Sequence, residues 1–416
     1  MLREHRPVPQ RPNDALSPST PSQDAGGEDR GLDPLDEAVR LHELAVSRRA
    51  EGRLQEAVPL CRQALALVER AVGPHHPDVA NVLNSLAGLY TDLGDYAEAE
   101  RLSQRSVAIM EPLSGSIEVE VLRVQSLGTL AGISRVQGRY GEAERLYQRA
   151  LALAETALGP EDLEVATCLN NLAVLYKYTG RFAAAQRLYR RALAITQPAL
   201  GPDHPNVATL YHNLGGLEHA RGRYARGEPF ARQAVAIREQ ALGPDHPDVA
   251  ADVAALAAIL DGQGQYDEAE ALYRRALAIF ERVYGSDHYE VAVTCNNLAA
   301  LSSANGDEAE AERLYRRSLA IKEQVLGPEH TDVAMTLNNL AVLYKSAGEY
   351  TRAEPLYRRA LAIFQAALGP SHPKVRTCRE NYAQLLREIP RQAKAAAPES
   401  HATRARTSRA RYPKKR

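Results

Sequence analysis

Adjacent polar residues that recur at four places are the strongest candidates for binding chemistry in this chain. They are Asn170–Asn171, His212–Asn213, Asn296–Asn297 and Asn338–Asn339. Asn is unfavourable in the middle of a helix because its side chain competes for backbone hydrogen bonds, so its repeated use indicates a gain elsewhere. A side-chain amide can donate to and accept from an extended backbone at the same time. These residues are therefore candidate contacts for an extended peptide.

Two lysines extend this candidate site. Lys177 and Lys345 follow the Asn pairs by six and seven residues, close to the same helix face, where their charge could meet a ligand carboxylate. Other copies have Gly128–Thr129 or Ala254–Ala255 instead, so we expect polar patches over 170–219 and 296–345 with a more apolar centre. In the alternative interpretation the Asn side chains bond between neighbouring helices and the lysines are solvated. The sequence leaves both interpretations open.

The histidines form a regular series that resembles a metal-binding array only superficially. They lie about one repeat apart and just before predicted helices, which favours helix capping and loop packing. They are His76, His204, His246, His288, His330 and His372. The sequence also lacks a Gly-rich phosphate loop, a GxSxG elbow, an HExxH motif and a CxxC pair. We therefore expect no metal, no cofactor and no catalysis.

Four isolated cysteines, Cys61, Cys168, Cys295 and Cys378, are expected to be small buried apolar residues. A chain without a disulfide pattern fits a reducing cytoplasm. No apolar run approaches the roughly 18 residues needed to cross a bilayer, and the first residues lack the apolar core of a secretory signal. The predicted location is cytoplasmic.

A repeat of 42 residues must position all these side chains. The segment LNNLAVLYK occurs at Leu169–Lys177 and again at Leu337–Lys345, an offset of 337 − 169 = 168, or four times 42. Glycines close each unit with spacings of 42, 44, 42, 42, 42, 42 and 42, from Gly73 to Gly369. Eight helical hairpins fit between Pro34 and Gly369, with a last helix from about Pro373 to Glu388.

One unit shows why each repeat becomes a hairpin. Pro205 suits the first position of a helix, and apolar residues then recur at helical spacing. Gly222 permits the left-handed conformation that ends this helix, and Tyr224 begins the second helix, which Gly243 ends. Each hairpin leaves an apolar face uncovered, so neighbouring hairpins must stack.

The series L-A/G…Y…G-x-Y/F…A…Y-x-x-A-L resembles the tetratricopeptide repeat, in the 42-residue form of kinesin light chains. The resemblance covers Pro34 to Glu388. It implies an all-α solenoid, a right-handed superhelix in which the first helix of each pair lines a concave groove. It also implies protein or peptide partners, held in that groove by Asn side chains at the positions found here.

The two ends differ from the repeats. Residues 1–33 are predicted to be disordered, and 34–389 form the solenoid. Residues 390–416 carry nine Lys or Arg and one Glu and are predicted to be a disordered basic tail. The predicted function is a non-catalytic scaffold for protein interactions. One alternative is an adaptor whose tail contacts nucleic acid or an anionic membrane. Another is a self-associating structural protein.

Overall fold

The computed structural model describes residues 33–113 and 115–396, with only the backbone from 390 on, and this part of the chain is helical. Its helices are Pro34–Ala50 (α1), Leu54–Val72 (α2), Pro77–Asp92 (α3), Tyr96–Met110 (α4), Ile117–Val136 (α5), Tyr140–Ala157 (α6), Leu163–Tyr178 (α7), Phe182–Leu200 (α8), Pro205–Ala220 (α9), Tyr224–Leu242 (α10), Pro247–Gly262 (α11), Tyr266–Tyr284 (α12), Tyr289–Ala304 (α13), Glu308–Leu326 (α14), Thr331–Ser346 (α15), Tyr350–Leu368 (α16) and Pro373–Ala396 (α17). Successive helices pair from α1–α2 to α15–α16, which we number hairpins 1 to 8. Eight hairpins and a final helix confirm the predicted all-α repeat fold.

Local chemistry explains where each hairpin bends. Gly222 has a φ of 67° and ends the turn between α9 and α10, and Gly243 has a φ of 85° after α10. Residues that have a Cβ rarely adopt these backbone angles. Pro205 occupies the first turn of α9, where its missing N–H costs no hydrogen bond. The predicted punctuation is therefore confirmed in the backbone.

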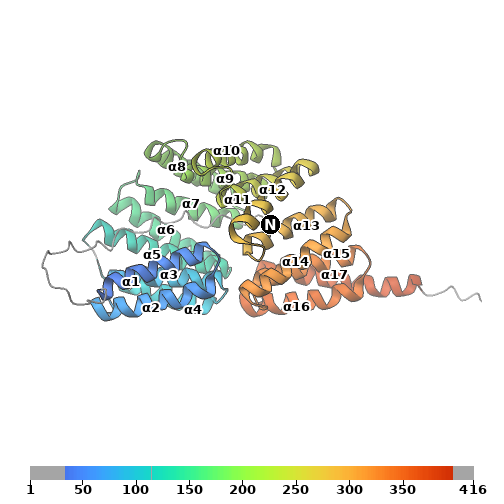
Figure 1. Cartoon of the computed structure of the whole chain (residues 1–416), viewed down its shortest axis with the longest axis horizontal. Helices are drawn as coiled ribbons and strands as arrows, with labels where there is room; N and C mark the ends of the chain where they lie inside the picture. The colour runs from blue at the N-terminus through green and yellow to red at the C-terminus, as the bar shows by residue number, and fades with distance from the viewer. Residues whose placement is uncertain (1–32, 114, 397–416) are drawn as a thin grey trace, which may run out of the picture.

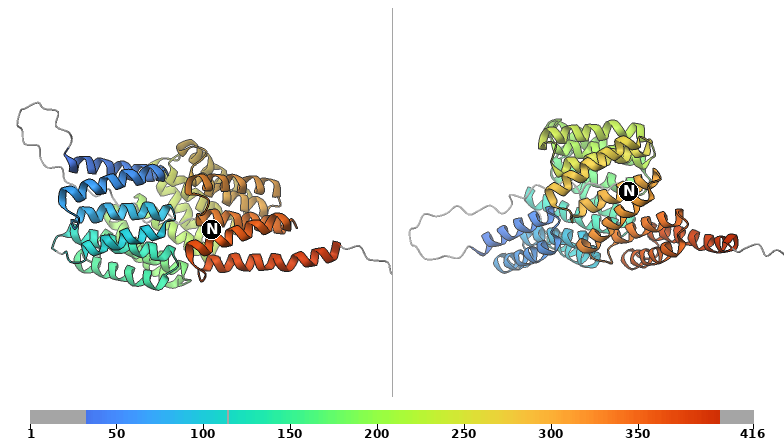
Figure 2. Two further views of the ribbon diagram at one scale, coloured as in Figure 1. Left: turned by 90° about the horizontal axis from the view of Figure 1, so that it is seen from below. Right: turned by 45° about the vertical axis from the view of Figure 1, so that its right-hand side comes forward.

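The hairpins stack into an array that curves back on itself (Figures 1 and 2). Each first helix contacts the first helix of the next hairpin, as α7 contacts α9 and α13 contacts α15, whereas successive second helices do not pack together to this extent. The first helices therefore form the shorter, inner side of the curve. We call this side the inner face, and the side formed by the second helices the outer face.

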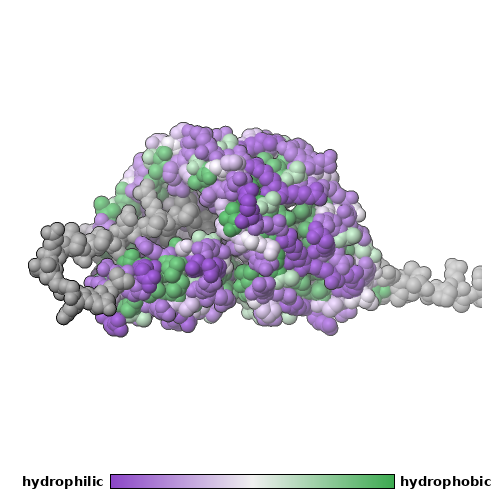
Figure 3. Space-filling view, in the orientation of Figure 1, coloured by the Kyte–Doolittle hydropathy of each residue, from purple (hydrophilic) through white to green (hydrophobic). Residues whose placement is uncertain are grey.

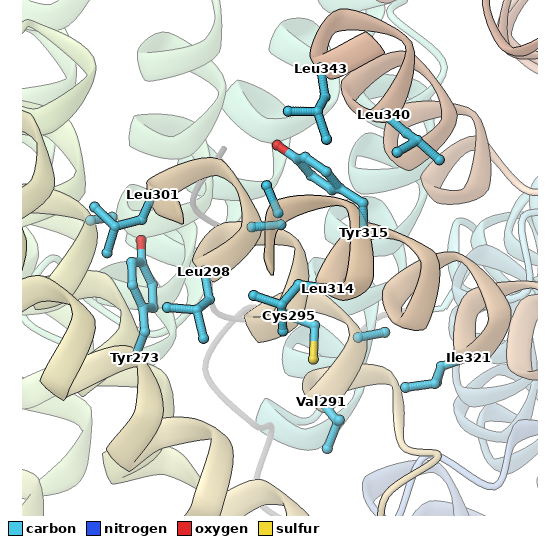
Figure 4. Packing of buried hydrophobic residues seen from close by; sticks show 14 of the residues in the cluster. Tyr273, Val291, Cys295, Leu298, Leu301, Leu314, Tyr315, Ile321, Leu340 and Leu343 are labelled. Atoms are coloured by element: carbon cyan, nitrogen blue, oxygen red, sulfur yellow. The ribbon is translucent and has the colours of Figure 1, made fainter. Parts of the chain in front are cut away.

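A repeated packing unit fills the space between hairpins. In Figure 4, Tyr273 of α12 lies against Leu301 of α13, and Tyr315 of α14 lies against Leu343 of α15. Both tyrosines and both leucines are buried. Alanines at the closest approaches, such as Ala276, are fully buried and let the helices come together. This packing makes each hairpin depend on its neighbours.

The surface shows no comparable concentration of apolar side chains on the face in Figure 3, where hydrophobic residues lie in small areas between hydrophilic ones. Large exposed apolar residues come from separate helices, for example Val46 of α1, Tyr178 of α7 and Tyr266 of α12. Among the described residues, no helix is long and apolar enough to cross a membrane.

The last helix is longer than expected. α17 continues to Ala396 instead of ending near Glu388, so its final turns enter the predicted basic tail. The disorder predicted for residues 1–32 and 397–416 falls outside the described residues.

Candidate functional site

Asn side chains of the inner face bond to one another from hairpin to hairpin. The Nδ2 of Asn213 donates to the Oδ1 of Asn170 over 2.8 Å. The same bond joins Asn339 to Asn296 and Asn381 to Asn338, at 3.2 Å in both cases. The first Asn of one hairpin thus accepts from the residue 43 positions later, and we call this series the amide ladder.

The amide ladder brings five of the predicted site residues together in pairs, together with Asn381, which the sequence analysis did not single out. Asn170 and Asn213 are only 2% exposed, and Asn296 is 9% exposed. Part of their hydrogen-bonding capacity therefore serves the junctions between hairpins. Asn381 could have been found by adding 43 to 338.

Asn171 and Asn297 have no preceding Asn to which their Nδ2 groups could donate, and we call these two residues the ladder starts. Forty-three positions before Asn171 lies Gly128, and 43 positions before Asn297 lies Ala254, and neither offers an amide oxygen. Asn171 accepts from Asn170 over 3.4 Å. Both Asn171 and Asn297 are partly exposed. In the part of the chain that the structure describes, no hairpin supplies their Nδ2 groups with a ladder partner.

His212 takes part in a different arrangement, which we call the charged cluster. Its Nδ1 lies 2.8 Å from the carboxylate of Asp252, and Arg238 donates to the other oxygen of Asp252 over 2.6 Å. Arg238 also donates to Thr209 over 3.1 Å. Asp252 is completely buried, and Arg238 and His212 are 4% and 7% exposed. The ring of His212 is therefore used between hairpins 5 and 6.

The same three positions, two repeats later, carry different chemistry. Lys322 donates to the hydroxyl of Thr336 over 2.9 Å, and that hydroxyl lies 3.4 Å from the Oδ1 of Asn296. Lys322 is 3% exposed. We call this group the hydroxyl cluster. Its residues lie 84 positions after Arg238, Asp252 and His212, so the two clusters are equivalent in the fold.

The two predicted lysines lie on the inner helices, both partly buried. The side chain of Lys177 extends to α9 of hairpin 5. Its Nζ lies 3.6 Å from the position that a Cβ on Gly216 would occupy. Burial lowers the pKa of nearby His219 to about 4, and the charge of Lys177 adds to the effect. His219 is therefore neutral at pH 7. Lys345 occupies the matching position near the end of α15.

A cavity of about 40 Å³ lies between α7, α8 and α9, lined by Asn170, Thr196 and Asn206 among others. It can hold about one water molecule, whereas pockets for small organic ligands occupy roughly 300–1,000 Å³. This part of the inner face therefore suits contact along an extended surface better than enclosure of a small molecule.

Sequence comparison agrees with this repeated architecture. A model of the tetratricopeptide repeat matches residues 36–111, 122–197, 179–240, 206–282, 250–324, 290–366 and 332–408. The chain is a tetratricopeptide repeat protein.

Solved structures of similar proteins include kinesin-light-chain-like arrays. BtubC (BKLC) from P. vanneervenii is 28% identical over 58% of this chain and 93% of its own, with a TM-score of 0.43. A putative kinesin light chain from Podosopora anserina is also 28% identical, over 50% of this chain and 97% of its own, with a TM-score of 0.40. A Rap protein complexed with Competence and Sporulation Factor is 14% identical over 86% of this chain and 99% of its own, with a TM-score of 0.52, and shares the fold.

The recurring histidines of this tetratricopeptide array cap its first helices. The Nδ1 of each histidine accepts a backbone N–H two residues later, at 3.0 Å for His330 and 3.1 Å for His246. The capping interpretation is therefore confirmed. The same bond occurs at His76, His204, His288 and His372.

All four cysteines are buried free thiols, as expected. Burial raises the pKa of Cys61 to about 12 and that of Cys295 and Cys378 to about 11, and it also raises the pKa of Cys168. A raised pKa keeps a thiol protonated and poorly nucleophilic at neutral pH. These side chains therefore pack the array.

A ladder of ion pairs on the outer face of the array escaped the sequence analysis. An Arg of one second helix pairs with a Glu near the end of the preceding one, over 2.5–2.8 Å. The pairs are Glu69–Arg105, Glu111–Arg149, Glu155–Arg191, Glu239–Arg275, Glu281–Arg317 and Glu323–Arg359. Between α8 and α10 this ion pair is missing, because Gln197 stands in place of the Glu and Gln233 in place of the Arg. The recurrence of Arg about 36 residues after Glu was a readable signal.

Proposed function

We propose that the array is a non-catalytic scaffold that holds an extended segment of a partner protein along its inner face. Tetratricopeptide domains generally mediate protein interactions. A repeat array also offers a long surface whose shape is set before the partner arrives, and preorganisation reduces the free-energy cost of binding.

The observation that carries this proposal is the pair of ladder starts. Asn171 and Asn297 are partly exposed on first helices, and their Nδ2 groups lack the ladder bond that the later Asn residues make. An amide in this position can donate to a backbone carbonyl of the ligand while its oxygen accepts an N–H. The completed ladder bonds hold the neighbouring amides in place.

Charge gives the proposed surface a direction. Lys177 lies six residues, about 1.7 turns, beyond Asn171 on α7, and Lys345 occupies the matching position on α15. A ligand carboxylate near either lysine would gain an ion pair. We therefore propose that the bound segment is acidic or ends in a carboxylate.

The chemistry of the remaining reactive groups supports a role without catalysis in the cytoplasm. The histidines are occupied as helix caps, and buried thiols with raised pKa values are poor nucleophiles. Four cysteines left unpaired fit a reducing compartment. The alternative of a tail-tethered adaptor stays a prediction, because residues 397–416 lie outside the described part of the chain.

A library of displayed 12-residue peptides, selected on the full chain, tests the proposal directly. We expect the selected peptides to be rich in Asp and Glu and to bind the Asn171→Ala and Asn297→Ala variants about five- to tenfold more weakly. A lost hydrogen bond costs about 1 kcal/mol, and 1.4 kcal/mol is tenfold in affinity. Isothermal titration would measure the change.

Asn339, which lies one hairpin after Asn297 and is also partly exposed, is the matched control. The Nδ2 of Asn339 already donates to Asn296, so it is not available to a ligand. Asn339→Ala should therefore lower the stability of the array more than its affinity for the peptides. Selection that yields no binding peptide, or peptides that bind the Asn171→Ala and Asn297→Ala variants as tightly as the native chain, would contradict the proposal.

A further inference from the structure

The turn glycines of the first three hairpins lie directly against histidines from the far end of the chain. A Cβ on Gly94 would lie 2.6 Å from the Cδ2 of His330, and one on Gly138 would lie 2.5 Å from the Cδ2 of His372. A Cβ on Gly52 would overlap the ring of His288 in the same way. Distances this short exclude any side chain at these three glycines unless the histidines move.

The contacts are regular along the sequence. The offsets are 288 − 52 = 236, 330 − 94 = 236 and 372 − 138 = 234. The two-residue difference equals the insertion that lengthens the spacing between Gly115 and Gly159 to 44. Hairpin 1 therefore faces hairpin 7, hairpin 2 faces hairpin 8 and hairpin 3 faces α17. One turn of the superhelix spans six hairpins.

Side chains around the glycines add to the contact. The hydroxyl of Tyr96 lies 3.5 Å from that of Thr331. Tyr289 and Leu326 of hairpin 7 are 7% and 9% exposed because they pack into the hydrophobic cluster of the first hairpins. The ring of His288 also stacks on Tyr284, with centroids 4.1 Å apart, which fixes its direction.

This interface is thin compared with the junctions between successive hairpins. Within the described residues, no helix of hairpins 1 to 3 packs along a helix of hairpins 7 and 8 or along α17. The contact is made by turns, helix starts and a few side chains. A small contact stabilises the closed form by little, so it can open while each hairpin keeps its neighbours.

We propose that this interface is a latch that closes one superhelical turn, and that opening it changes the spacing of the inner face and so the affinity for a partner. The latch consists of Gly52, Gly94 and Gly138 with His288, His330 and His372. The latch itself rests on the contacts above, whereas its coupling to binding rests on the proposed function. By linkage, a partner that prefers the closed form also favours closure.

Other turns of the same array provide an internal comparison. Gly94 and Gly264 end equivalent turns with φ angles of 79° and 77°. A Cβ on Gly264 would have no described atom within 4 Å, whereas one on Gly94 meets His330. A substitution at either glycine causes the same backbone strain, and only the one at Gly94 also obstructs the latch.

The test measures the distance across the latch in the full chain. Gln104 on α4 and Thr351 on α16 are exposed, so cysteines introduced there can carry a fluorescent donor and acceptor, while the four buried native thiols react slowly. In Gly94→Gln we expect single-molecule energy transfer to shift to lower values. Gly264→Gln should keep the transfer efficiency of the parent labelled chain.

A second pair of variants separates the latch from helix capping. His330→Ala and His246→Ala each remove one cap of the same kind, but only His330 lies on a turn glycine. We expect lower energy transfer for His330→Ala alone. The latch would be overturned if the energy transfer shifted equally in Gly94→Gln and Gly264→Gln, or equally in the two histidine variants. It would also be overturned if Gly94→Gln and His330→Ala kept the parent energy transfer while circular dichroism showed native helicity.

The coupling is tested with the peptides selected for binding. We expect them to bind Gly94→Gln several-fold more weakly than Gly264→Gln and to raise energy transfer in the open variant. Equal affinity for the two glycine variants, with the distance shift present, would overturn the coupling. A failure of the proposed function would show separately, as unchanged binding to the Asn171→Ala variant.

Discussion

The junctions between hairpins 5 and 6 and between hairpins 7 and 8 use the same three positions in different ways. The charged cluster and the hydroxyl cluster are made of His212, Arg238 and Asp252 and of Asn296, Lys322 and Thr336, respectively. The first places a carboxylate between two basic groups, and the second places a hydroxyl between an ammonium and an amide. The helices that carry the two sets have the same lengths, since α9, α10 and α11 and likewise α13, α14 and α15 have 16, 19 and 16 residues.

The difference shows how stability and tolerance are separated in a repeat array. Asp252 is completely buried and accepts from both neighbours, and these two bonds stabilise its charge. Thr336 carries no charge and also bonds to the carbonyl of Asp332 over 3.2 Å. The charged cluster therefore depends on every one of its members, whereas the hydroxyl cluster can lose one at a lower cost.

The largest expected effect is that of Asp252→Ala. It removes the nearer carboxylate of buried Arg238 and leaves only that of Asp248, at 3.5 Å. Breaking a buried charge pair from one side costs about 3–5 kcal/mol. We expect a much lower urea midpoint by circular dichroism and faster amide hydrogen exchange in α9 to α11 than elsewhere. Thr336→Ala, at the equivalent position, removes one hydrogen bond from the ammonium of Lys322 and should cost less, about 2 kcal/mol. Equal losses would refute the comparison.

Exchanging the whole cluster should cost less than breaking it. The triple variant His212→Asn, Arg238→Lys and Asp252→Thr installs the hydroxyl cluster between hairpins 5 and 6. No buried carboxylate remains to be left unpaired, so we expect about 1–2 kcal/mol of lost stability, clearly less than for Asp252→Ala alone. The same urea and hydrogen-exchange measurements apply. A triple variant as unstable as Asp252→Ala would show that the two junctions are not interchangeable.

The sequence predicted the hairpins because each one is encoded locally. Glycines such as Gly222 and prolines such as Pro205 act on their own residues, and the apolar spacing acts within one helix. The amide pairs were found because Asn is unusual in mid-helix. Their sharing between hairpins was foreseen as an alternative, but which Asn bonds to which depends on the stacking of neighbouring helices.

The charged cluster and the latch were not predictable from single repeats. Arg238 looks like any helical arginine until α11 brings Asp252 to it, 14 residues later. The latch depends on the small rotation that each hairpin adds, summed over six hairpins, and no residue encodes that sum. The positive φ of its turn would require a glycine at Gly94 even without the latch. The glycine itself therefore gives no sign of the contact with His330.

A smaller effect is expected within the amide ladder. Asn339→Ala removes the donor that bonds to Asn296 at the hydroxyl cluster, and we expect about 1 kcal/mol of lost stability. Asn297→Ala, at a ladder start, removes no bond of this kind and should change stability by less than about 0.5 kcal/mol. Paired urea titrations decide the matter, and a larger loss for Asn297→Ala would contradict the ladder.

The smallest expected effect comes from completing the outer ladder where it is interrupted. Gln197→Glu together with Gln233→Arg would create the rung that joins hairpins 4 and 5, by analogy with Glu155 and Arg191 at 2.5 Å. Exposed ion pairs contribute about 0–1 kcal/mol and weaken with salt. We expect the double variant to be more stable than the sum of its single variants by about 0.5 kcal/mol in a double-mutant cycle at low salt. The coupling should vanish near 1 M salt. A coupling that persists at that ionic strength would mean that packing, rather than charge, joins the outer helices.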